Sequence, residues 1–174
     1  MLKKIFWTGV LILLLGFLLK LTFGEIEIGN DKSWCFDRYR MYNYQIRDMR
    51  KQEGIEKSVF STYWTFPYLY IYGMSGYTKI TAVPFYTKIE KIPNKVFYNY
   101  ISSYNDEPIS VYHYSLNHLK NTYGDSLIIY NSLKSINYKD YIIFNELKVK
   151  GEVYYNLTKQ SYQGHLLDGL EEIE

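Results

Sequence analysis

The 174-residue sequence is poor in several residue types, and each shortage excludes a class of protein. A single cysteine, Cys35, excludes a disulfide framework and a cysteine-based zinc site. The sequence also lacks a phosphate loop, a dinucleotide-binding glycine motif, His-Glu-x-x-His and Gly-x-Ser-x-Gly. His113 and His118 are five residues apart, a spacing that places them on different faces of a helix. We therefore predict neither a metal site nor a cofactor.

The excess of positive over negative charge disappears once the first 24 residues are set aside. The whole chain carries a formal net charge of +2, but Lys3, Lys4 and Lys20 all lie in this leader. Residues 25–174 contain 17 basic and 18 acidic side chains. Binding to nucleic acid needs a basic surface that neutralises phosphates. We therefore expect no nucleic-acid partner.

The leader itself has the pattern of a membrane segment. Residues 5–19 carry no charge, and residues 5–23 form a helix of about 28 Å, close to the hydrocarbon thickness of a bilayer. We predict that residues 1–24 are an N-terminal transmembrane helix and that residues 5–23 contact the membrane. The alternative is a cleaved signal peptide and a secreted protein. The anchor is favoured because Thr22-Phe23-Gly24 is a poor cleavage site.

The distribution of lysines around the leader predicts its orientation. Lys3 and Lys4 precede the apolar run, whereas Glu25 and Glu27 follow it. Positive residues are retained on the cytoplasmic side of a membrane. The N-terminus is therefore expected in the cytoplasm. The protein would cross the membrane once, with residues 25–174 as an extracytoplasmic domain.

Two helices are predicted within this domain. The first covers residues 36–52, because apolar residues recur at helical spacings of three and four: Cys35, Tyr39, Tyr42, Ile46 and Met49. The second covers residues 107–123, with Asp106 as N-cap, Pro108 in the first turn and Gly124 just beyond the end.

The remaining sequence predicts strands. Residues 68–72 and 77–83 flank Gly73-Met74-Ser75-Gly76 and read as a hairpin, and residues 25–34 read as an exit segment or a first short strand. Three further strands are expected at 126–131, 141–144 and 152–158, with a turn at Lys150-Gly151. Residues 96–104 fit either a helix or a strand, and residues 163–174 read as a frayed tail. The fold class is thus α+β: a transmembrane helix, then one domain with an antiparallel sheet and about two helices.

Tyrosine compensates for the scarcity of small apolar residues, since the chain has 21 tyrosines and only one alanine. Tyr68, Tyr70 and Tyr72 alternate along one predicted strand, so their rings share a face. This row either packs in the core, which is favoured, or forms an amphipathic binding surface. The candidate binding residues are Trp64, Tyr68, Tyr70 and Tyr72.

We therefore expect a membrane-anchored extracytoplasmic protein that binds a protein or glycan partner, as an envelope accessory or an immunity or inhibitor-type protein. A non-enzymatic role is favoured. The alternative is a cell-envelope hydrolase that cleaves glycan or peptide through two carboxylates. The acids available for such a pair are Asp106, Glu107, Asp125, Asp140, Glu146 and Glu152.

Overall fold

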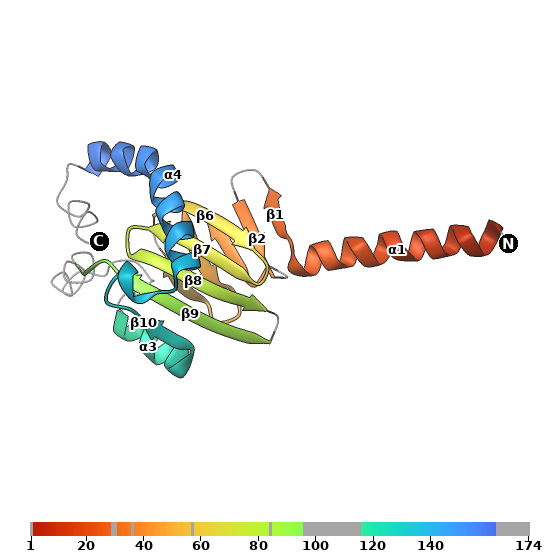
Figure 1. The fold of residues 1–174 in the computed structure, drawn as a ribbon, viewed down its shortest axis with the longest axis horizontal. Coiled ribbons are helices and arrows are strands. Elements are labelled where there is room, and N and C mark those ends of the chain that lie inside the picture. Colours follow the sequence, from red (N-terminus) through yellow and green to blue (C-terminus); the bar gives the residue numbers. More distant parts are fainter. Residues whose placement is uncertain are drawn as a thin grey trace.

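The protein is α+β, with two five-stranded sheets and helices at the outside of the domain (Figure 1). The computed structural model describes residues 2–28, 31–35, 37–56, 58–83, 85–95 and 116–162. This confirms the α+β class, but the structure has two sheets where one antiparallel sheet was predicted, and one of the two is mixed. The predictions for residues 96–104 and 163–174 lie outside the described residues.

The first sheet, sheet A, is antiparallel, and its strands follow one another in sequence order. It contains β1 (Glu25–Ile28), β2 (Asp31–Trp34), β3 (Tyr39–Tyr42), β4 (Gln45–Asp48) and β5 (Glu53–Glu56). The two strands within residues 25–34 confirm the expectation of a first short strand there.

The predicted helix over residues 36–52 is wrong, because β3 and β4 form a hairpin in this stretch. Asn43 and Tyr44 form its two-residue turn, and both have positive φ, of 48° and 57°. Such turns match the twist of the flanking strands. Tyr39 and Ile46 are buried as the helical pattern required, but the turn brings them to one face instead of a helix. Tyr39 and Ile46 are seven residues apart, and this spacing is compatible with both a helix and a hairpin.

The second sheet, sheet B, has the order β10-β9-β8-β7-β6. Its strands are β6 (Val59–Thr65), β7 (Tyr68–Gly73), β8 (Gly76–Val83), β9 (Tyr86–Pro93) and β10 (Leu127–Ile129). Neighbouring strands are antiparallel except β10, which runs parallel to β9. The β7–β8 hairpin and the strand within residues 126–131 confirm the corresponding predictions.

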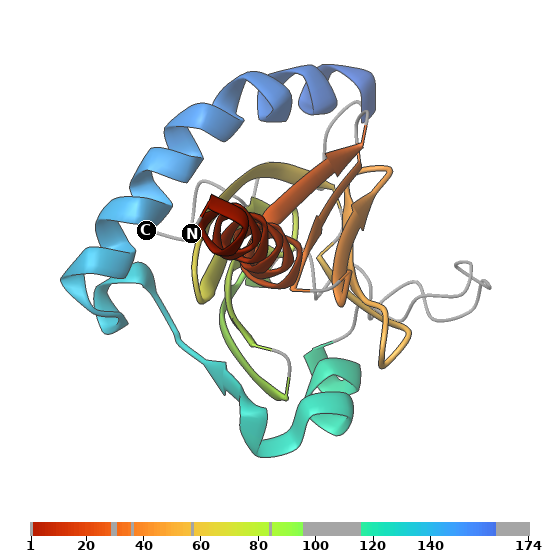
Figure 2. The ribbon, with the colours of Figure 1, turned by 90° about the vertical axis from the view of Figure 1, so that its right-hand side faces the viewer.

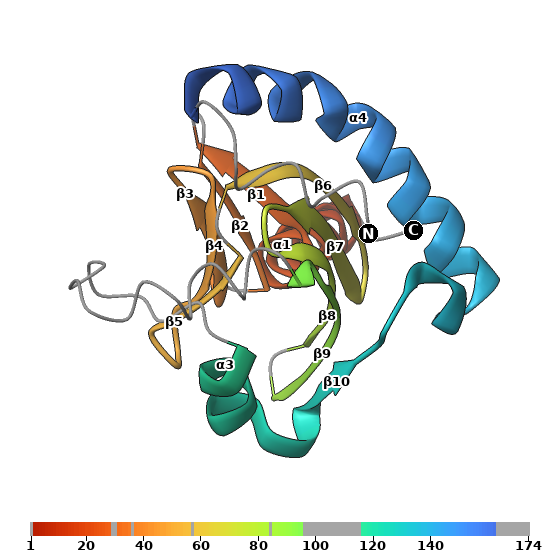
Figure 3. The same cartoon turned by 90° about the vertical axis from the view of Figure 1, so that its left-hand side faces the viewer.

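The two faces of sheet B belong to two different cores. Leu69 and Ile71 of β7 face sheet A, in a cluster that includes Trp34, Tyr39 and Ile46. Tyr70 and Tyr72, which alternate with them, point to the opposite face. Sheet B is therefore the middle layer of the domain, as Figure 3 shows.

Helix α4 (Tyr138–Tyr162) covers the second face of sheet B. Its inward residues Asp140, Phe144, Leu147 and Gly151 follow helical spacings of four, three and four. A Cβ at Gly151 would lie 2.8 Å from the Tyr72 ring, so the helix lies directly on the sheet. The strands predicted at 141–144 and 152–158, and the turn at Lys150-Gly151, are therefore wrong.

Helix α3 (Leu116–Tyr123) closes the edge of the core between the sheets, with Leu119 and Tyr123 buried. It confirms the end of the helix predicted over 107–123, whereas residues 96–115 lie outside the described residues. Gly124 follows with a φ of +52°, in agreement with the predicted glycine at the helix end. The short helices η1 (Gly124–Ser126) and η2 (Leu133–Ser135) flank β10.

Helix α1 (Leu2–Phe23) projects away from both sheets as a separate rod (Figure 1). In the part of the chain that the structure describes, no helix combines the length and the apolar character needed to cross a bilayer. The predicted transmembrane helix is therefore not found there.

Candidate functional site

The four candidate binding residues divide between the core and its margin. Tyr70 and Tyr72 are only 1% and 3% exposed, beneath α4. Tyr68 and Trp64 are partly buried, and they pack against opposite cores. The structure thus does not gather these four residues on one surface. For the inner part of the row, it agrees with the core-packing interpretation.

The same face of sheet B carries an ionic cluster where α4 begins. Lys79 on β8 donates to Asp140 on α4, with its Nζ 2.5 Å from Oδ2, and Glu90 on β9 lies 3.5 Å from the same Nζ. The Tyr70 hydroxyl donates to the other Asp140 oxygen at 2.7 Å. Asn137 completes what we call the Lys79 cluster: Tyr70, Lys79, Glu90, Asn137 and Asp140. Its ionic side chains are only 7–14% exposed.

Asn137 also explains where α4 starts. Its Oδ1 accepts a hydrogen bond from the backbone N–H of Asp140 at 2.9 Å, the geometry of a helix N-cap. Its Nδ2 donates to Asp140 Oδ2 at 2.6 Å. One residue therefore caps the helix and orients the carboxylate that holds the helix to the sheet.

The pKa of Asp140 reflects these contacts. Burial alone would raise it, but hydrogen bonds from Lys79, Tyr70 and Asn137, with the charge of Lys79, lower the pKa below its usual value. Burial and the neighbouring Asp140 carboxylate raise the pKa of the Tyr70 hydroxyl. The pair therefore consists of a carboxylate and a neutral phenol that donates to it.

A second ionic cluster lies on the opposite face of the same strands. Lys91 Nζ donates to Glu56 at 3.1 Å, to Ser75 at 2.7 Å and to Thr78 at 2.9 Å. Ser75 also donates to Glu56 through both its hydroxyl and its backbone N–H. These four residues, the Lys91 cluster, are all 0% exposed.

A serine beside a lysine resembles the paired groups of some nucleophilic enzymes. In the Lys91 cluster, however, the serine is sealed from solvent and the ammonium donates all three of its protons. A substrate cannot reach Ser75, and Lys91 has no free electron pair with which to act as a base. The cluster is therefore structural: it joins β5 of sheet A to β8 and β9 of sheet B.

Of the acids available to a hydrolase, the structure places one in a cluster. Asp140 faces Glu90, which the sequence did not single out, across the shared Lys79. Asp125 and Glu146 are exposed, whereas Asp106 and Glu107 lie outside the described residues and no side-chain position is described for Glu152. Asp140 holds α4 to sheet B through Lys79 and Tyr70, whereas Glu90 contacts Lys79 from β9, and we assign the two acids no catalytic role.

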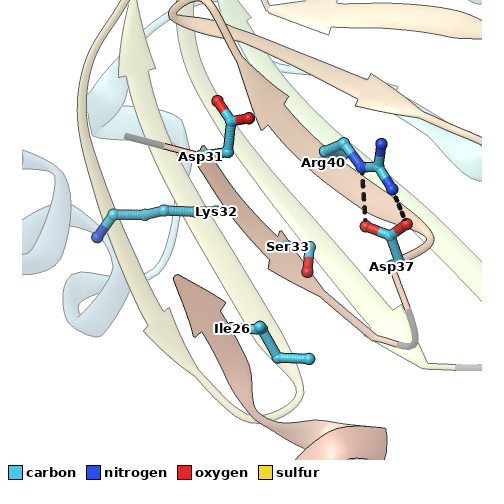
Figure 4. A pocket seen from close by; sticks show the side chains of 6 residues that line it. All are labelled: Ile26, Asp31, Lys32, Ser33, Asp37 and Arg40. Atoms are coloured by element: carbon cyan, nitrogen blue, oxygen red, sulfur yellow. Dashed lines mark hydrogen bonds and ion pairs between the residues drawn. The ribbon is translucent and has the colours of Figure 1, made fainter. Parts of the chain in front are cut away.

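An open pocket of about 350 Å³ lies on sheet A near the exit of α1 (Figure 4). Its lining residues are Ile26, Asp31, Lys32, Ser33, Asp37 and Arg40. Arg40 forms a two-point ion pair with Asp37, and Lys32 pairs with Glu25 and Glu27. Its two cations are thus already neutralised by neighbouring carboxylates.

Cys35 and His118 are two further reactive side chains that the structure describes. Cys35 is a free, buried thiol, as the sequence suggested, and burial raises its pKa. His118 Nε2 lies 2.6 Å from a carboxylate oxygen of Glu53, and His113 lies outside the described residues. Among the described residues no group of three metal-ligating side chains comes together.

Comparisons with known proteins identify no relative: no family model, no curated protein and no solved structure matches this chain. The proposals below therefore depend on the residues themselves.

The buried lysines and carboxylates are the main features that the sequence interpretation missed. Lys79 lies two residues from Tyr77 and from Thr81, so it shares a face with tyrosines that pack in a core. That spacing of two was a usable signal for a buried cation. Its partner Asp140 lies 61 residues further along the chain, and spacing alone does not reveal such a contact.

Proposed function

We propose that α1 attaches this protein to a membrane and that the α+β domain binds a protein or glycan partner on the extracytoplasmic side. The observation that supports attachment is the exposure of apolar side chains on α1. Nine large hydrophobic residues there are 50–75% exposed: Phe6, Trp7, Leu11, Ile12, Leu13, Leu14, Leu15, Leu18 and Leu19. A helix that is apolar on every side requires an apolar environment.

The sequence supports the same proposal. The charge-free run from residue 5 to residue 19 extends through residue 23 if Lys20 reaches the headgroups, and this matches the thickness of a bilayer. Lys3 and Lys4 before it favour a cytoplasmic N-terminus. The domain would then act in the exported compartment.

The outward side of α4 is the surface that we propose for the partner. Tyr138, Ile142 and Val149 are 77%, 40% and 67% exposed, and their spacing places them in one stripe. The stripe lies opposite the buried residues Asp140 and Leu147. Grouped apolar side chains on a surface often mark a contact with another molecule.

Attachment can be tested by flotation of the full chain from cells expressing it. Substitution of both Ile12 and Leu15 by Lys should move most of the protein out of the membrane fraction, since central charges oppose insertion. Val149→Lys, at an exposed domain position, is the matched control and should still float. Recovery of the double variant in membranes at the wild-type level would contradict the proposal. The mass of the membrane-bound protein separates an uncleaved anchor from a cleaved leader.

Partner binding can be tested by photocrosslinking in the native membrane. A photoreactive residue at position 142 should give a discrete adduct, because Ile142 lies in the apolar stripe. The same residue at position 146 is the control, since Glu146 is exposed but lies beside the stripe. Equal or absent crosslinking at both positions would argue against this surface.

A further inference from the structure

Three exposed aromatic side chains lie at the ends of two hairpins of sheet B. Phe66 follows β6, Phe85 lies in the turn between β8 and β9, and Tyr86 is the first residue of β9. They are 51%, 97% and 54% exposed. The partly buried Trp64 ring packs 6.3 Å from the Phe66 ring. We call Phe66, Phe85 and Tyr86 the aromatic tips.

The two hairpin ends are adjacent to each other. Tyr68 pairs with Thr81 across β7 and β8, and the backbone N–H of Ala82 donates to the carbonyl of Pro67 at 2.7 Å. The turn after β6 and the turn after β8 therefore form one continuous edge of the domain.

Helix α1 leaves the domain at this same edge. Glu25, the first residue of β1, pairs with Trp34, and Trp34 pairs with Tyr39. The Tyr39 hydroxyl is 2.7 Å from that of Thr87, the residue after Tyr86. Figure 1 shows the end of β8 and the start of β9 on the side of the domain from which α1 projects, and Figure 2 views that side along α1.

The connection between α1 and the domain is one residue long. Gly24 alone separates Phe23, the end of α1, from Glu25. One residue spans less than about 4 Å of chain. A bilayer that holds α1 must therefore come close to the edge that carries the aromatic tips.

The tips are also held rigidly. Arg38 donates to the carbonyl of Val83, the last residue of β8, at 3.1 Å, and its guanidinium lies 3.6 Å from the buried Asp48. The Tyr39–Thr87 hydrogen bond fixes the start of β9 from the same side. The backbone that carries the exposed rings is thus held in place before binding, which lowers the entropy lost when the rings bind.

We propose that the aromatic tips enter the headgroup region of the bilayer and fix the orientation of the domain on the membrane. This inference rests on the proposed attachment through α1. Aromatic side chains concentrate at the level of lipid headgroups, where Tyr satisfies its hydroxyl and buries its ring. A lipid surface fits better than a protein partner because the one-residue connection leaves little space for a protein at this edge.

The test measures lipid contact in the full-length protein, reconstituted in vesicles of phosphatidylcholine and phosphatidylglycerol. Phe85→Cys is labelled with an environment-sensitive fluorophore, and quenching by lipids that carry a spin label near the headgroup is recorded. Tyr42→Cys is the matched control: Tyr42 is 56% exposed and flanks the β3–β4 turn. That turn contacts Val59, opposite Gly73 at the far end of β7 from the tips. Unsubstituted protein gives the background, since Cys35 is buried.

Lipid quenching should be at least about twofold stronger at position 85 than at position 42, with blue-shifted emission only at position 85. Equal quenching at both positions, in protein that floats with the vesicles, would overturn this inference and leave the proposed attachment standing. Blue-shifted emission at position 85 without lipid quenching would indicate a second copy of the chain on the tips and would also overturn it. Failure of the unsubstituted protein to float would overturn the proposed attachment, and the inference with it.

Discussion

The two ionic clusters of sheet B occupy opposite faces of the same two strands, and they differ in how completely they are sealed. Thr78 and Lys91 are cross-strand partners that face sheet A, whereas the next pair, Lys79 and Glu90, faces α4. Every member of the Lys91 cluster is 0% exposed, whereas the ionic members of the Lys79 cluster keep some contact with solvent. The first joins the two sheets, and the second holds a helix to one of them.

This difference implies that the loss of one buried lysine should destabilise the fold more than the loss of the other. A buried charge is tolerated when its hydrogen bonds are complete, and removal of one partner leaves the other uncompensated. Glu56 keeps both donors on Ser75, but it is 0% exposed, so no water can replace the positive charge of Lys91. Asp140 keeps Tyr70 and Asn137 as donors, so loss of Lys79 would be less damaging.

The largest expected effect is the loss of Lys91. Lys91→Met should lower the free energy of unfolding by about 3–5 kcal/mol, because it removes the positive charge beside the buried Glu56 carboxylate. Guanidinium unfolding in detergent, followed by tryptophan fluorescence, to which the buried Trp34 contributes, measures the change. Lys88→Met on the same strand is the control, and its partly exposed pair with Glu90 predicts a loss of about 0–1 kcal/mol. Similar losses in the two variants would contradict the proposed role of the Lys91 cluster.

The contribution of the Lys79 cluster to the free energy of unfolding should depend on pH. The folded pKa of Asp140 lies below its unfolded value of about 3.9. Its stabilisation is therefore complete above that unfolded value and is lost as the pH falls through the folded pKa. Asp140→Asn should cost about 1–3 kcal/mol at pH 7, as expected for hydrogen bonds to a charged group.

The gap in unfolding free energy between wild type and Asp140→Asn should narrow as the pH drops from 5 toward 2. Chemical unfolding at a series of pH values measures this gap. A gap that stays constant over that range would show that the Asp140 charge does not hold α4.

Two glycines allow the space beside the Lys91 cluster to be compared with the space beneath α4. A Cβ at Gly73 would lie 2.7 Å from Cγ of Glu56, so Gly73→Ala should displace this carboxylate and cost about 1–3 kcal/mol. A Cβ at Gly151 would crowd Tyr72 and Phe60 beneath α4, but alanine recovers about 1 kcal/mol of helix propensity. Gly151→Ala should therefore cost less in the same unfolding assay. The reverse order would mean that the α4 contact is the tighter one.

The smallest effect is expected at the start of α4. Asn137→Ala should cost about 1 kcal/mol, because it removes the N-cap and one donor to Asp140. Asn137→Ser keeps a capping oxygen and should recover most of the loss. Thermal unfolding by circular dichroism compares the two variants. Equal destabilisation by Ala and Ser would show that the cap contributes nothing measurable.

The sequence predicted the parts of the fold whose contacts are local. The β7–β8 hairpin was predictable because Gly73 and Gly76 mark its turn between alternating residues. The stretch from Tyr39 to Ile46 was misassigned because a hairpin and a helix can bury the same residues. The decisive signal was Asn43 at a position where a two-residue turn requires positive φ.

The buried clusters were less predictable, because their ionic pairs join distant segments. Lys91 and Glu56 lie 35 residues apart, and neither stands in a motif. Helix α4 was read as strands because Tyr141 to Phe144 is a short apolar run that fits both periods. The capping residue Asn137 was the signal that could have corrected this assignment, since it precedes a series of inward positions with helical spacing.

The single residue Gly24 between α1 and β1 has a consequence for encounters with a partner. A long linker lets a tethered domain search a large volume and lowers its effective concentration at any one point. Here the connection is a single residue, so a membrane-held domain would move mainly by lateral diffusion together with its helix. Association would then be a search within a plane, and its rate would follow surface density rather than bulk concentration.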